Sequence, residues 1–129
     1  MVGSSWGGAV ALKLLADGSY AGPSVLLCPA HRAPERWAGV FGADRLREEA
    51  SALISSVANL HPEVKARCVL VHGTADTTIP IEDSRELAQR SGIRLIEVNG
   101  GSHGLGAIVR DGRLRHYIEA LSTGQASQI

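Results

Sequence analysis

The chain has 129 residues, of which 44% are hydrophobic and 20% are charged, which is typical of one ordinary folded domain with a substantial core and excludes a disordered chain. Its 13 basic and 13 acidic side chains cancel, so no long-range field attracts nucleic acid or an anionic membrane surface, and we expect neither as a partner. No segment approaches the roughly 20 apolar residues of a transmembrane helix, and the first residues lack the pattern of a secretory signal.

The first predicted elements flank a glycine–serine motif. Residues 3–7 read Gly-Ser-Ser-Trp-Gly, with only the stub of a strand before them. The mostly apolar run over 9–16 is too long for a buried strand and ends at Asp17-Gly18, so it predicts a well-buried helix. Ser5 is therefore expected at the N-terminus of a helix.

The middle of the chain predicts two buried strands and one helix. Residues 24–28 form a short apolar run between two prolines, which is typical of a strand buried on both faces and favours a parallel sheet. Residues 30–63 begin as a loop and then carry apolar side chains at helical spacing over 43–60, which predicts one amphipathic helix. Residues 64–72 predict the second buried strand.

The C-terminal part continues this alternation. Residues 80–91 predict a helix that opens with proline and acidic side chains, residues 94–98 a third strand, and residues 114–121 a closing helix with apolar side chains at i, i+3, i+4 and i+7. Only the polar residues 122–128 are expected to fray. Strands that alternate with helices predict an α/β fold with a parallel sheet, right-handed crossovers and a single domain over 1–129.

The two cysteines have a structural explanation. Cys28 and Cys68 both lie inside apolar runs, where small buried thiols are a better interpretation than a disulfide or a metal site. We therefore expect a reducing compartment and a cytoplasmic location.

Ser5 is the candidate nucleophile. Gly3 and Gly7 remove side chains on either side of it, which lets the backbone make a sharp strand-to-helix turn that exposes the hydroxyl. A glycine–serine helix cap explains the motif equally well when it is taken alone. A phosphate-binding loop is excluded, because no Lys-Ser or Lys-Thr pair follows the glycines at the required spacing.

Asp76 is the candidate acid. It follows the second buried strand through a four-residue turn, at the carboxyl end where parallel sheets place their sites. An Asx-turn or a helix cap is the alternative explanation. Glu82 and Asp83 are weaker candidates, because they fall in the first turn of the next helix and its dipole accounts for them.

His103 is the candidate base. It follows the third strand and lies in a glycine-rich loop, Gly101-Ser102-His103-Gly104, where a histidine has little packing role; the alternative is a solvated loop residue. The other histidines have better explanations as loop, cap, strand-end and surface residues, in the order His31, His61, His72 and His116. No Cys/His spacing predicts a metal site. Ser, Asp and His thus come in one order, each at a predicted strand end.

With these three motifs the chain resembles the α/β-hydrolase superfamily over nearly its whole length. The matching segments are the nucleophile elbow over 3–8, the acid loop over 72–80 and the base loop over 101–104. The resemblance implies a serine hydrolase that cleaves a carboxylic ester, thioester or amide of a small acyl substrate without a cofactor. Ser5 would attack the acyl carbon, His103 would act as base and then acid, and Asp76 would stabilise the imidazolium. The backbone N–H of Trp6 would be the first oxyanion donor.

The chain departs from this family at its start. A complete member has several strands before the elbow, and one of their loops supplies a second oxyanion donor, whereas only Met1 and Val2 precede Gly3 here. We therefore expect a partial α/β-hydrolase domain whose N-terminal strands are missing. The alternative function is that of an impaired or relic hydrolase domain, which acts as a binding partner and self-associates through its open sheet edge.

Residues 30–63 occupy the position at which such hydrolases insert a lid or cap, and they are the candidate cap of this domain. Trp37, Val40 and Phe41 within it are candidates to line an acyl pocket. Packing of the amphipathic helix onto the sheet explains them as well and is the favoured interpretation.

Overall fold

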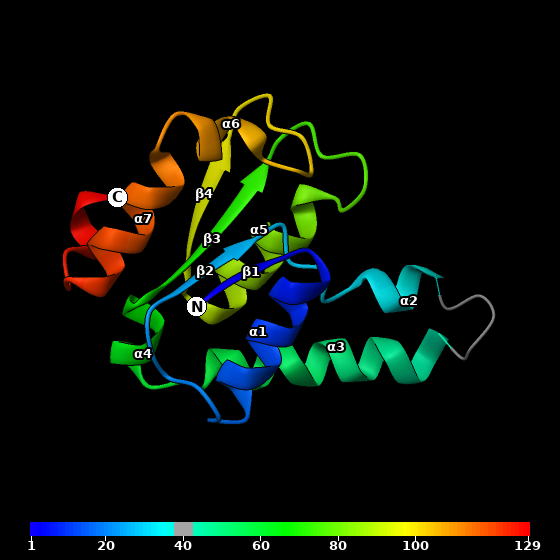
Figure 1. Cartoon of the computed structure of the whole chain (residues 1–129). Helices are drawn as coiled ribbons and strands as arrows, with labels where there is room; N and C mark the ends of the chain where they lie inside the picture. The colour runs from blue at the N-terminus through cyan, green and yellow to red at the C-terminus, as the bar shows by residue number, and fades with distance from the viewer. Residues whose placement is uncertain (38–42) are drawn as a thin grey trace.

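The computed structural model describes residues 1–37 and 43–129, and Figure 1 shows strands that alternate with helices along the chain. The described residues form one sheet in the order β1-β2-β3-β4. Its strands are β1 (Val2–Ser4), β2 (Ser24–Leu27), β3 (Cys68–Gly73) and β4 (Arg94–Val98). Every neighbouring pair is parallel, so all carboxyl ends meet at one edge of the sheet. This arrangement confirms the predicted α/β fold.

Helices cover both faces of the sheet (Figure 1). The helices α1 (Trp6–Ala16), α3 (Ala43–Ala58) and α5 (Ile81–Ser91) lie on one face, and α6 (Gly106–Arg110) and α7 (Arg113–Ser122) lie on the other. Alternate residues of β2 and β3 serve the two layers: Leu26 and Leu70 pack in the first cluster, and Val25, Leu27, Val69 and Val71 in the second. Every position of β2 and β3 is buried, as predicted for strands with both faces covered.

Three short helices were not expected from the sequence. They are α2 (Ala33–Trp37), α4 (Pro62–Ala66) and α6, each of five residues, which is too short to produce a helical periodicity. The helix α4 also corrects the start of the second buried strand, predicted at residue 64 and found at Cys68. The side chain of His61 accepts a hydrogen bond from the backbone N–H of Glu63 at its N-terminus, so the prediction of a cap is confirmed.

The prediction that residues 122–128 fray is wrong. A 3₁₀ helix, η2 (Ala126–Gln128), follows α7, and Ala126 and Ile129 pack against the second apolar cluster. The guanidinium of Arg94 donates to the carbonyl of Ala126 at 3.2 Å, and the His116 ring contacts the carbonyl of Gln128 at 3.0 Å. These partners come from β4 and α7, so composition alone could not reveal them. No helix in the described ranges is long and apolar enough to cross a membrane.

Candidate active site

Ser5 occupies the turn between β1 and α1 in a conformation that few residues adopt. Its φ is 55° and its ψ is −115°, and such a positive φ is strained for a residue with a side chain. Its backbone N–H donates to the carbonyl of Leu27 at 2.9 Å, and its carbonyl accepts from the N–H groups of Ala9 and Ala30. The sheet and the helix together hold this turn, which presents the side chain beyond the carboxyl end of β1.

The glycines of this turn act differently from the prediction. A Cβ on Gly3 would overlap the carbonyl of Gly7, and a Cβ on Gly8 would lie 2.9 Å from the Cα of Pro29. A Cβ on Gly7 would meet nothing within 4 Å. Gly3 and Gly8, rather than Gly3 and Gly7, are therefore the positions that must lack a side chain. Gly8 must lack a side chain because α1 crosses the loop after β2 at this point. The sequence of the motif does not show this contact.

Alanine substitutions should separate the two kinds of glycine. Gly3→Ala is expected to lower the free energy of unfolding by about 1–3 kcal/mol, because the backbone of the turn must move to admit the methyl group. Gly7→Ala, the matched control, should raise it by about 0.5–1 kcal/mol, because alanine favours a helix over glycine. Chemical denaturation followed by circular dichroism measures both. Equal destabilisation by the two variants would contradict the assignment.

Asp76 lies in the loop after β3, and its carboxylate is divided between two tasks. One oxygen, Oδ1, accepts the backbone N–H groups of Thr78 and Ile79 at 2.8 and 2.9 Å. The other, Oδ2, lies 2.8 Å from Nδ1 of His103. The side chain is fully buried. Asp76 therefore forms the Asx-turn that was the alternative explanation. This turn fixes the carboxylate so that Oδ2 faces His103.

His103 connects Asp76 to Ser5. While Nδ1 contacts the carboxylate, Nε2 lies 3.0 Å from Oγ of Ser5, a residue 98 positions away in the chain. The acid and base loops meet backbone to backbone, because a Cβ on Gly73 would overlap the carbonyl of Gly101. The structure thus brings together the three side chains that the sequence selected, from the ends of β1, β3 and β4.

The protonation of this group follows from its hydrogen bonds. Burial opposes ionisation of Asp76, but the N–H of Ile79, the ring of His103, the N–H of Thr78 and the thiol of Cys28 together outweigh it and lower the pKa of the carboxyl group. An ionised Asp76 can only accept, so Nδ1 of His103 carries the proton. Nε2 is then the acceptor for the hydroxyl proton of Ser5, which is the arrangement that nucleophilic attack requires.

Comparison with known proteins shows which fold this architecture has. No protein-family model and no curated protein matches the chain, but solved structures do. A CIB-like hydrolase from Thermoplasma acidophilum superposes with a TM-score of 0.62 at 21% identity, over 95% of this chain and 49% of that one. Est1E from Butyrivibrio proteoclasticus gives 0.63 at 18% identity, over 99% and 60%. The chain has an α/β-hydrolase fold.

A meta-cleavage product hydrolase from Pseudomonas fluorescens is also similar, with a TM-score of 0.63 at 13% identity over 95% of this chain. This chain covers 64% of that structure, and so spans about half to two thirds of the α/β-hydrolases that it matches. The fold is therefore a partial α/β-hydrolase fold, as the sequence predicts.

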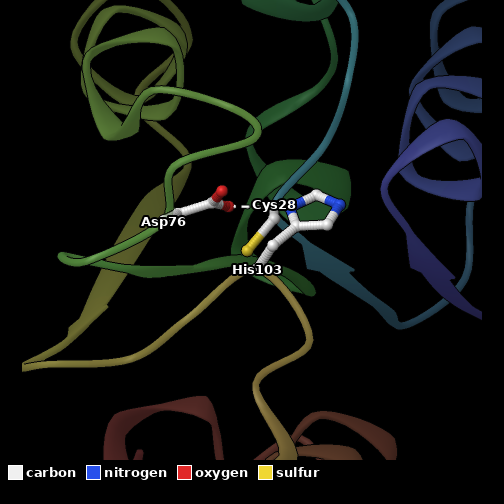
Figure 2. Close-up of side chains that lie close together, drawn as sticks. All are labelled: Cys28, Asp76 and His103. Atoms are coloured by element: carbon white, nitrogen blue, oxygen red, sulfur yellow. Dashed lines mark hydrogen bonds and ion pairs between the residues drawn. The ribbon is translucent and has the colours of Figure 1, made fainter.

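Cys28 lies close to Asp76 and His103, the candidate acid and base (Figure 2). Ligand atoms of Cys28, Asp76 and His103 all lie within 4.8 Å of one another. Burial raises the pKa of the Cys28 thiol to about 12, so it stays protonated beside the carboxylate. A cation here would have to displace the proton of the thiol and the proton of His103 Nδ1. We therefore assign Cys28 to the buried, uncharged surroundings of Asp76 and His103.

The weaker acidic candidates lie outside this group. Asp83 is buried and forms a two-point ion pair with Arg36 of α2, and Glu82 pairs with Arg85 at the surface. Arg32 adds a second link, because it binds Glu86 of α5 at 2.6 Å. These bridges tie α2 and the residue before it to α5, so Asp83 and Glu86 have a structural role beyond the dipole argument.

The candidate cap over 30–63 stays a prediction. Within it, α3 packs against α1 and α5, and Ala50, Ile54 and Val57 are buried. A cavity of about 710 Å³ lies between the second half of α1, α3 and the start of α2. None of the three candidate catalytic residues lines it, so we do not assign the acyl pocket to it. Val40 and Phe41, and the side chain of Trp37, lie outside the described residues.

Proposed function

We propose that this chain carries the catalytic triad of a serine hydrolase that cleaves a carboxylic ester, with thioester and amide substrates as further possibilities for the same chemistry. The observation that carries the proposal is the unbroken hydrogen-bond path from Ser5 Oγ to His103 Nε2 at 3.0 Å and from His103 Nδ1 to Asp76 Oδ2 at 2.8 Å. Est1E and the other solved hydrolases of the same fold support a hydrolytic function.

The reaction would proceed in two halves. Ser5 Oγ attacks the acyl carbon while its proton moves to Nε2 of His103, and the ionised Asp76 stabilises the imidazolium. The backbone N–H of Trp6, in the first turn of α1, would donate to the developing oxyanion. His103 then gives the proton to the departing alcohol, which leaves an acyl-enzyme on Ser5. Water attacks this ester in the second half, with His103 again as the base.

An active-site probe tests the proposal. A fluorophosphonate forms a covalent bond with an activated serine, so we expect the full chain to be labelled at Ser5 in a peptide identified by mass spectrometry. Ser5→Ala should abolish labelling. Ser4→Ala is the matched control, because Ser4 is the exposed neighbouring serine, and labelling should persist. Absence of labelling in the unsubstituted chain would count against the proposal.

One observation favours a second candidate function, that of a binding domain. In the described sheet β1 is an edge strand, and Val2, Trp6 and Val10 near it are 47%, 48% and 60% exposed. An unpaired edge beside apolar side chains favours pairing with another chain. This function predicts no probe reaction together with self-association in analytical ultracentrifugation.

A further inference from the structure

A fully buried histidine lies beside the proposed acid, Asp76. His72 is part of β3 and is fully buried. Its Nε2 lies 2.9 Å from the carbonyl oxygen of Ile79 and 3.2 Å from Oδ2 of Asp76. Its Nδ1 lies 2.7 Å from Oγ of Ser84, which is buried on α5. The ring therefore joins the central strand, the acid loop and the following helix.

These partners determine where the ring carries its proton. A carbonyl oxygen and an ionised carboxylate can only accept hydrogen bonds, so Nε2 of His72 must be the donor to both. Nδ1 then accepts the hydroxyl proton of Ser84. Protons are thus donated in one direction, from Ser84 to His72 and from His72 to the acid loop.

We infer that His72 is a positioning residue of the proposed active site, whose Nε2–H holds Asp76 Oδ2 and the Ile79 carbonyl so that the carboxylate faces His103. The inference rests on the proposed function. Ile79 is held on both sides, because its N–H donates to Oδ1 of Asp76 and its carbonyl accepts from His72. Removal of the His72 ring leaves the carbonyl of Ile79 without this donor, and it removes a donor from the Asp76 carboxylate as well.

A core histidine without this role would behave differently. If His72 only fills volume, an apolar side chain of similar size should preserve the reactivity of Ser5 and its pH dependence, whatever it does to stability. If His72 positions the acid, the loss of a donor makes the ionised carboxylate less favourable and lets the loop move. Among the described residues, the titratable side chains that face the carboxylate are His72 from β3, His103 from the loop after β4 and Cys28 from the end of β2.

The test measures the rate of fluorophosphonate labelling of Ser5 against pH in the full chain. His72→Leu is expected to lower the labelling rate about tenfold to a hundredfold. It should also move the acid limb, the part of the pH–rate profile where the rate falls as the pH is lowered, to higher pH. His72→Gln should recover most of the rate, because its amide N–H can reach the position of Nε2. His31→Leu is the matched control: His31 is buried and its Nδ1 contacts the carbonyl of Pro29. It should lower stability and leave the acid limb in place.

A second measurement does not depend on reactivity. In the chain with ¹⁵N-labelled histidine, NMR should show the proton of His72 on Nε2, and a proton on Nδ1 with a bare Nε2 would overturn the inference. So would a labelling rate and acid limb in His72→Leu equal to those of the unsubstituted chain. If His72→Leu does not fold, Ser84→Ala takes its place and should shift the limb in the same direction by a smaller amount; no shift would overturn the inference. Absence of labelling in the unsubstituted chain instead defeats the proposed function, and the NMR result then decides the hydrogen-bond assignment.

Discussion

Replacement of His103 by alanine is expected to slow acylation of Ser5 by about 10⁴-fold to 10⁶-fold, because the hydroxyl loses the group that takes its proton. The fold should survive, since the His103 side chain is 26% exposed and belongs to none of the apolar clusters; loss of its contact with the buried Asp76 carboxylate should cost about 1–3 kcal/mol. The labelling rate with a fluorophosphonate and the hydrolysis of a p-nitrophenyl ester measure the loss. Circular dichroism of the variant should match that of the unsubstituted chain.

The matched control is His116→Ala. His116 is exposed and its ring contacts the carbonyl of Gln128, but it lies on α7 and contacts none of the three proposed catalytic residues. Labelling of this variant should proceed at the rate of the unsubstituted chain. If His103→Ala retained that rate as well, Ser5 would be activated by something other than the imidazole, and the proposed mechanism would be wrong.

The parts of the fold that the sequence predicts well are those with a strong local pattern. The runs around Val25 and Val69 are apolar at every position, and a strand with both faces covered is the simplest structure for them. The sequence places Ser5, Asp76 and His103 each after a predicted strand, and parallel strands bring their carboxyl ends to one edge. Proximity of the three side chains therefore follows from topology, without knowledge of any individual contact.

What the sequence could not predict depends on contacts between segments far apart in the chain. Gly8 must lack a side chain because Pro29 crosses it, and nothing within the elbow motif shows this. The sequence predicts an ordinary strand-end residue at His72, whereas its ring contacts Asp76 and Ser84. The signal available was its place directly before the Gly73 turn, four residues from the acid, which puts both side chains near the same strand end.

Asp76→Asn is the second substitution with a large expected effect. The amide NH₂ would face the ring nitrogen of His103 in place of an acceptor oxygen, so Nδ1 would become the acceptor and the ring proton would move to Nε2. Nε2 could then no longer take the hydroxyl proton of Ser5. We expect acylation of Ser5 to slow about 10⁴-fold while the fold is retained. Labelling with a fluorophosphonate, quenched at a series of times, measures the rate, and ¹⁵N NMR of the histidines reports the tautomer of His103.

The same variant tests the pKa of Asp76 through stability. A carboxyl group whose pKa is lower in the folded chain than in the unfolded chain stabilises the fold at every pH above its unfolded value, and this stabilisation is lost as the pH falls toward the folded value. The difference in unfolding free energy between the unsubstituted chain and Asp76→Asn should therefore be constant near neutral pH and shrink below about pH 4.

Asp83→Asn is the control for burial, because Asp83 is a buried carboxylate paired with Arg36 and does not contact His103. It should destabilise the fold and leave the tautomer of His103 unchanged. A slow acylation rate in both variants would mean that general destabilisation, and not the tautomer, explains the loss.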